Sequence, residues 1–194
     1  TMGYIAHPQI RARGTFGGAI AHADPAAQLP ALALALNAKM VIKRKGSERV
    51  VSAEDFIVGP FMTVLEPEDM LAEVILPPLP ARSAGSYKQV SRQRGGYAQA
   101  AAISVVSLDD RNRVKDVRSV LFSVGETPIL SKYASKVLVG NEPTEAALAD
   151  VAAYAAEHEC DPGSDLHGTT EYRRQLVEVL VRRSLTEAVQ RAKK

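Results

Sequence analysis

Cysteine and aromatic residues are scarce in this 194-residue chain. It contains one cysteine, Cys160, and no tryptophan, and aromatic residues make up 5% of it. A single cysteine excludes a disulfide framework and any zinc or iron–sulfur site built from cysteines of this chain. The small number of aromatic rings argues against a stacking surface for single-stranded nucleic acid.

A strong charge of either sign and a long apolar run are also missing. Lys and Arg number 24 against 22 Asp and Glu, a formal net charge of +2, which argues against a nucleic-acid binder. The longest apolar stretch, residues 29–36, falls well short of the ~20 residues that cross a bilayer, and no signal-peptide pattern is present. With 46% hydrophobic residues, the composition predicts a cytoplasmic protein with one large core or two small ones.

The first part of the chain combines a glycine-rich stretch with short helices and strands. Residues 14–30 predict a glycine-rich loop that leads into a helix over 29–36. Two β-rich runs around a Gly-Ser turn predict a hairpin over residues 40–51. Residues 71–76 are typical of a strand that ends at the following proline pair.

Residues 77–85 are the best internal boundary, because four helix- and strand-breaking residues fall within nine positions. We therefore divide the chain into residues 1–80 and 81–194. The second part predicts three strands followed by three helices, over residues 86–90, 100–108, 114–124, 131–138, 144–157 and 170–192, with Thr144 as an N-cap. This order predicts an α+β fold in which helices cover a three-stranded antiparallel sheet.

The last predicted helix has one apolar face. Its apolar residues recur at helical spacing, and they are Tyr172, Leu176, Val177, Leu180, Val181, Leu185 and Val189. Four arginines are expected largely outside this face, namely Arg173, Arg174, Arg182 and Arg183. We interpret them as a solvated surface, with docking of a partner subunit as the alternative.

The densest chemical signal lies in residues 11–25. Three of the five residues 14–18 are glycines, which allow a sharp turn and bring bare N–H groups close to a ligand. Thr15 adds a hydroxyl group, and the next helix adds its N-terminal dipole. Asp24 is placed to accept a hydrogen bond from a ribose hydroxyl or to cap that helix. From spacing alone, a phosphate site and a ligand-free turn stay equally open.

Other kinds of catalytic or metal site find little support. No Gly-x-Ser-x-Gly elbow is present, and the acidic neighbours of Cys160 disfavour its thiolate. His7, His22 and His158 lack a second ligand at metal-binding spacing. His167 is interpreted as a residue at the start of the last helix.

A longer pattern carries a family resemblance. It comprises RARGTFGG at residues 11–18, AHADPAAQLP at 21–30, Leu71 ahead of a strand end, YKQVSR at 87–92 and LHGTTEYRRQL at 166–176. In this order, these strings resemble the FAD-binding medium subunit of the molybdenum hydroxylases, the family of aerobic carbon monoxide dehydrogenase and xanthine dehydrogenase. The resemblance runs along essentially the whole chain. It implies part of a two-lobed FAD-binding domain followed by an α/β-sandwich domain.

The resemblance also implies where FAD binds. Thr15, Gly17 and Gly18 would hold the pyrophosphate, as the second of the family's two glycine segments, and Asp24 would lie beside the ribose–phosphate portion. The full set of cofactor-binding residues that it implies is Thr15, Phe16, Gly17, Gly18, Ala19, Asp24, Gln28, Leu71, Lys88 and Tyr97.

At the flavin ring the resemblance implies three neighbours. Leu71 and Lys88 would lie near the isoalloxazine, where a lysine charge favours the anionic reduced flavin, and Tyr97 would cover one face. The competing interpretations are a solvated or ion-paired lysine and a tyrosine that anchors a domain junction.

The chain departs from the family in three places. Ala19 and Gln28 stand where relatives often carry a polar and an acidic residue. The family's first glycine segment, on an N-terminal lobe, has no counterpart here. We therefore expect this chain to be a fragment or a separately encoded piece that is inactive by itself.

The function that the resemblance implies is that of an oxidoreductase subunit. FAD would pass electrons from iron–sulfur clusters on a small partner subunit to an external acceptor, and molybdopterin would lie on a large partner subunit. No nucleic acid or membrane span is expected. The alternatives are a non-catalytic assembly module and a nucleotide-binding regulatory domain that binds ADP but not FAD.

Overall fold

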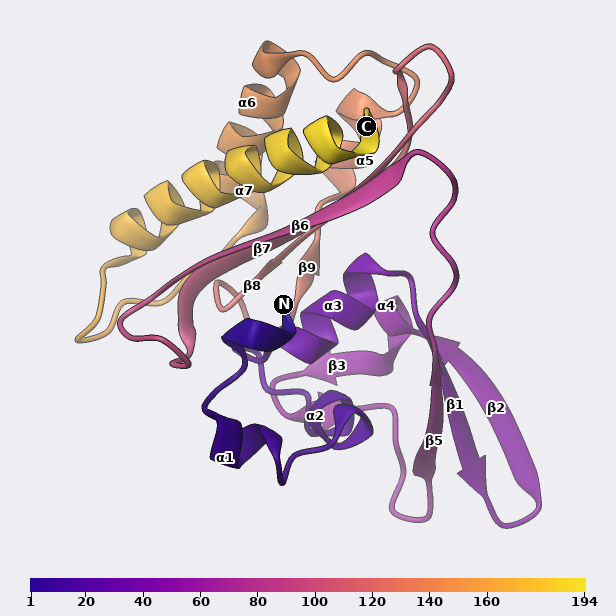
Figure 1. Cartoon of the computed structure of the whole chain (residues 1–194). Helices are drawn as coiled ribbons and strands as arrows, with labels where there is room; N and C mark the ends of the chain where they lie inside the picture. Colours follow the sequence, from indigo (N-terminus) through magenta and orange to yellow (C-terminus); the bar gives the residue numbers. More distant parts are fainter.

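A four-stranded antiparallel sheet runs through the middle of the molecule, in the order β6-β7-β8-β9 (Figure 1). The computed structural model describes all residues, 1–194. The strands are β6 (Ser83–Ser91), β7 (Ala98–Leu108), β8 (Val114–Phe122) and β9 (Ile129–Leu130). The three predicted strands are confirmed, but a three-stranded sheet is wrong, because β9 adds a fourth strand beside β8. Two residues are too few to show an alternating pattern in the sequence.

Helices cover one face of this sheet (Figure 1). They are α5 (Lys132–Leu138), α6 (Glu145–Tyr154), the π-helical turn η2 (Ala155–Glu159) and α7 (Thr170–Ala192). Leu121 of β8, Val106 of β7 and Leu185 of α7 are at most 1% exposed in the core between them. The predicted helices over 131–138 and 170–192 are confirmed, whereas the one over 144–157 changes from α to π geometry after Tyr154.

Hydroxyl side chains fix where these helices begin. The side chains of Ser131, Thr144 and Thr169 each accept a hydrogen bond from the backbone N–H three residues later, at 3.0, 3.2 and 3.2 Å. Each bond satisfies an N–H group that has no acceptor within the helix. The predicted N-cap at Thr144 is confirmed.

The start of α7 corrects two expectations about its faces. The side chain of Arg173 is 13% exposed, not solvated, and its Nη2 lies 2.6 Å from Asp165 Oδ2. Tyr172 is 42% exposed, outside the apolar face to which it was assigned. Residues 161–169 fold back over the first turn of α7, and Asp165 in this segment covers Arg173. Helical periodicity alone carries no information about such a covering loop.

The first part of the chain forms a second unit, with a three-stranded sheet in the order β2-β1-β5. Its elements are η1 (Met2–Tyr4), α1 (Pro8–Arg11), α2 (Phe16–His22), α3 (Gln28–Ala35), β1 (Lys39–Arg44), β2 (Ser47–Ser52), α4 (Ala53–Phe56), β3 (Ile57–Gly59), β4 (Met62–Thr63) and β5 (Met70–Ile75). The predicted hairpin, the strand over 71–76 and the helix over 29–36 are confirmed as β1–β2, β5 and α3.

This unit packs on the other face of the central sheet. Ile103 and Phe122 of that sheet share a buried cluster with Ile20, Leu34 and Phe56 of the first unit. The central sheet is therefore buried on both faces, one against α7 and one against α3. The division of the chain into residues 1–80 and 81–194 stays a prediction.

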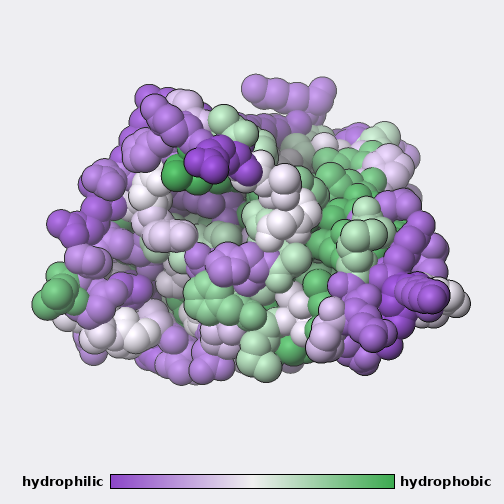
Figure 2. Space-filling model, turned by 90° about the horizontal axis from the view of Figure 1, so that it is seen from below, coloured by the Kyte–Doolittle hydropathy of each residue, from purple (hydrophilic) through white to green (hydrophobic).

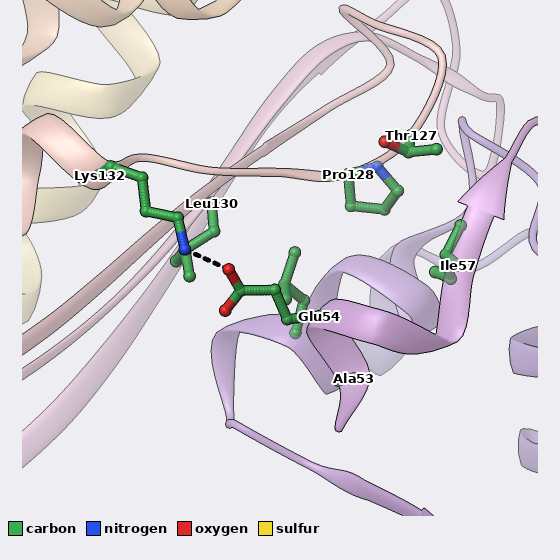
Figure 3. A pocket seen from close by; sticks show the side chains of 8 residues that line it. Ala53, Glu54, Ile57, Thr127, Pro128, Leu130 and Lys132 are labelled. Carbon is green, nitrogen blue, oxygen red and sulfur yellow. Dashed lines mark hydrogen bonds and ion pairs between the residues drawn. The ribbon is translucent and has the colours of Figure 1, made fainter. Parts of the chain in front are cut away.

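Polar contacts also join the two units. Arg118 Nε on β8 donates to Leu34 O at the end of α3, at 3.0 Å. Glu54 of α4 pairs with Lys132 of α5 across a small cavity of about 120 Å³ (Figure 3). This cavity lies between α4, β9 and the turn before β9, and contains none of the predicted cofactor residues.

Replacement of Leu185 by alanine tests the core beneath α7. Because Leu185 is fully buried, we expect Leu185→Ala to lower the free energy of unfolding by about 3 kcal/mol, measured by urea denaturation. Gln190→Ala, at an exposed position of the same helix, is the control and should change it by under ~0.5 kcal/mol. Equal, small changes in both variants would contradict this core assignment.

A buried carboxylate predicts a pH dependence of stability. Asp69 is 1% exposed and pairs with Arg44 and Arg49 at 2.8 and 2.5 Å. The backbone N–H of Glu66, followed by Arg44, holds the pKa of Asp69 below its ordinary value. The unfolded chain therefore takes up the proton first, so this stabilisation is complete above about pH 4 and is lost as the pH falls through the lowered pKa.

We expect the stability of Asp69→Asn to fall less than that of the wild type as the pH is lowered. The measurement is the urea midpoint at neutral pH and at about pH 3, with the exposed Asp110→Asn as the control. If Asp69→Asn kept the full pH dependence of the wild type, the Asp69 contacts would not be its source.

Candidate functional site

The glycine-rich stretch forms the first turn of α2 and not the predicted loop. Thr15 caps this helix, because its Oγ1 accepts from the N–H of Gly18 at 3.0 Å, and α2 begins at Phe16. Gly17 is helical as well. The glycines with positive φ are elsewhere, at Gly46, Gly95 and Gly140. The threonine cap, not glycine flexibility, therefore sets the shape of this turn.

The turn leaves groups free to meet a ligand. Gly18 and Ala19 N–H donate to Thr15 Oγ1 and to Thr15 O, whereas Phe16 and Gly17 N–H have no acceptor in the chain. A Cβ built on Gly17 has no atom within 4 Å, so the space there is open, but one on Gly18 would lie 2.6 Å from Thr15 Oγ1. The two free N–H groups and the positive end of α2 favour an anion at this place.

Asp24 follows α2 and closes a tight turn. Its Oδ1 accepts from the N–H of Ala26 at 2.8 Å. The N-cap of α3 is Ala27, which has no side-chain oxygen, so the expectation that Asp24 caps this helix is wrong. Asp24 uses its side chain to hold the turn between α2 and α3.

The structure brings Asp24 and Tyr97 together from different units. Tyr97 lies in the connection between β6 and β7 and is 69% exposed. The negative charge of Asp24, and then partial burial, raise the pKa of the Tyr97 phenol. Tyr97 and the end of α2 therefore border the same part of the surface, where the sequence predicted the cofactor.

Four of the predicted site residues pack against the core of the first unit. Phe16, Ala19 and Leu71 are partly buried there. Gln28 is 7% exposed, and its Nε2 donates to the backbone oxygen of Tyr4 at 3.4 Å. These side chains support α2, and Gln28 ties the N-terminal segment to α3.

Lys88 is not brought together with the other predicted residues. Its Nζ lies 2.7 Å from Oε2 of Glu187 on α7, and this bond lowers the pKa of Glu187. Neighbouring residues of a strand point to opposite faces of a sheet. Tyr87 packs toward the first unit, so Lys88 points toward α7. This geometry agrees with the competing interpretation of Lys88 as an ion-paired lysine.

Phe61 is a residue beside α2 that the sequence interpretation missed. Its ring centroid lies 5.1 Å from that of His22, and it is 58% exposed. Its N–H donates to Ala23 O at 3.0 Å, with a φ of 56°. Nothing in the local sequence pointed to α2.

No group of three His, Cys, Asp or Glu side chains is placed to hold a metal ion. Burial raises the pKa of the Cys160 thiol, which donates to Ala156 O. No helix combines the length and hydrophobicity needed to cross a membrane.

Both parts of the chain match models of known protein families. Residues 1–79 match the FAD binding domain in molybdopterin dehydrogenase, and residues 85–188 match the CO dehydrogenase flavoprotein C-terminal domain. The chain belongs to this family of FAD-binding molybdenum hydroxylase subunits. The family resemblance noted in the sequence is thereby confirmed.

Relatives within the family are subunits of oxidoreductases. The 6-hydroxypseudooxynicotine dehydrogenase complex subunit alpha of Paenarthrobacter nicotinovorans is 36% identical, over 98% of this chain and 64% of the relative. The carbon monoxide dehydrogenase medium chain of Afipia carboxidovorans is 37% identical, over 97% of this chain and 65% of the relative. This chain thus spans slightly less than two thirds of these relatives.

The family's fold agrees as well. A carbon monoxide dehydrogenase structure from Hydrogenophaga pseudoflava superposes with a TM-score of 0.92, at 33% identity, and covers 97% of this chain and 65% of that one. The expected α+β architecture is therefore confirmed.

The contact between Asp24 and Tyr97 predicts a measurable shift. Because the Asp24 carboxylate disfavours the phenolate, Asp24→Asn should lower the pKa of Tyr97 toward its ordinary value near 10. Ultraviolet titration, with the Tyr97→Phe variant subtracted in each background, isolates this one phenol. An unchanged Tyr97 pKa in Asp24→Asn would mean that the two groups do not interact.

Proposed function

We propose that this chain is the flavoprotein portion of a molybdenum hydroxylase, which receives electrons from iron–sulfur clusters on a small partner subunit and delivers them to an external acceptor. Molybdopterin and the substrate site would lie on a large partner subunit. The observation that carries the proposal is the open first turn of α2, with two unpaired N–H groups, in a chain of this family.

The residues of this turn fit an FAD pyrophosphate. The N–H groups of Phe16 and Gly17 would donate to its oxygens, and the Thr15 hydroxyl keeps its own hydrogen to donate, because Oγ1 only accepts from Gly18. Asp24, whose Oδ1 is already bonded to Ala26, would meet ribose hydroxyls. Tyr97 would border the flavin. When bound, FAD supplies the redox chemistry, and the chain supplies binding and orientation.

The exposed apolar side chains of the first unit support a covering segment. Large hydrophobic side chains with exposures of 45–63% occur along this unit, namely Val58, Phe61, Met62, Met70 and Ile75. Figure 2 shows the molecule from below, with hydrophobic side chains exposed between hydrophilic ones. We propose that the family's N-terminal lobe covers these side chains and supplies the other half of the phosphate cradle.

Gly17→Val tests the site without disturbing the fold. A side chain at position 17 meets open space within this chain, so we expect the thermal midpoint of the FAD-free protein to be unchanged. Bound FAD, measured as flavin absorbance per protein in the purified complex, should be lost. Ala153→Val, at an exposed position of α6, is the matched control and should keep its flavin. A colourless wild type, or full flavin retention in Gly17→Val, would contradict the proposed function.

A further inference from the structure

We propose that His167 is a positioning residue for the flavin site: it holds the loop between β6 and β7, which carries Tyr97, in place. This inference rests on the proposed function. It concerns three side chains, Arg92, Gln99 and Asp165, that bond to His167, with Arg173 bonded to Asp165 behind them; neither the core nor the phosphate turn uses this network.

His167 is presented by a segment anchored to α7. Its N–H donates to Asp165 Oδ1 at 2.7 Å, and Asp165 Oδ2 accepts from Arg173 Nη2 at 2.6 Å. Asp165 and Gly168 exchange two backbone hydrogen bonds, at 3.1 and 3.3 Å, which close the turn that contains His167. Because Arg173 belongs to α7 and is mostly buried, the turn is fixed to the long helix.

From this turn, His167 reaches both ends of the loop. Arg92, just after β6, has its Nη1 3.0 Å from His167 Nδ1, and Gln99, on β7, donates through Nε2 to His167 O. A guanidinium has only donors, so His167 Nδ1 accepts this hydrogen bond. Figure 1 shows the β6–β7 loop and the segment before α7 at the same end of the molecule.

The loop also meets the N-terminal segment and Asp24. Gly95 has a φ of 79° and lies against the N-terminal segment, where a Cβ would be 2.7 Å from Ala6 O. Tyr97 itself is largely exposed and meets Asp24 on the far side. The loop therefore lies between Asp24 on one side and the turn that contains His167 on the other. Loss of the His167 contacts would free Tyr97 to move away from the flavin.

Two substitutions at position 167 separate positioning from bulk. His167→Leu removes the acceptor for Arg92, whereas His167→Asn keeps an acceptor close to the place of Nδ1. In the purified complex with FAD, we expect His167→Leu to raise the FAD dissociation constant about tenfold and to raise the flavin fluorescence yield. His167→Asn should restore both, and His158→Leu, a distant histidine, should change neither.

A double variant tests whether His167 acts through Tyr97. If it does, Tyr97→Leu alone and Tyr97→Leu with His167→Leu should weaken FAD binding equally. If His167→Leu fails to fold, Arg92→Leu takes its place in every comparison, because it removes the same contact from the loop side. If the wild type keeps its flavin, FAD binding as tight as the wild type's in His167→Leu or Arg92→Leu would overturn this inference. Additive losses in the double variant would overturn it as well. A wild type that binds no FAD would overturn the proposed function and this inference with it.

Discussion

Burial of both faces of the central sheet is the constraint on which the rest of the structure depends. Strands β7 and β8 alternate between two cores, so Leu121 faces α7 and Phe122 faces α3. Strands β7 and β8 cannot shift their register by one residue without moving apolar side chains from one core to the other. This shared sheet fixes the first unit against the β6–β7 loop, and so it brings Asp24 and Tyr97 to one site.

The same alternation decides what each predicted site residue can do. Tyr87 and Lys88 are neighbours in the chain but lie on opposite faces, and Lys88 is bound to Glu187 of α7. At the other end of the site, the Thr15 cap satisfies Gly18 N–H and leaves the N–H groups of Phe16 and Gly17 for a ligand. The candidate site is thus a helix start and a loop that two separately packed units hold side by side.

Much of the fold could be predicted from the sequence, because local signals agreed with tertiary packing. The hairpin, β5, α3 and α7 follow from turn residues and periodicity. Strand β9 and the covering of Arg173 could not be predicted, because two residues show no period and a loop that folds back leaves no local signal. The glycines of α2 indicated a loop, but the Thr15 cap made a helix. The Arg92–His167 contact joins residues 75 positions apart, beyond what spacing can indicate.

An experimental structure of the assembled protein with FAD tests the central claim most directly. The quantity to measure is the distance from the pyrophosphate oxygens to the backbone nitrogens of Phe16 and Gly17. The account predicts hydrogen-bond distances of about 3 Å at both nitrogens. A pyrophosphate bound elsewhere, with these two nitrogens facing only water, would contradict it.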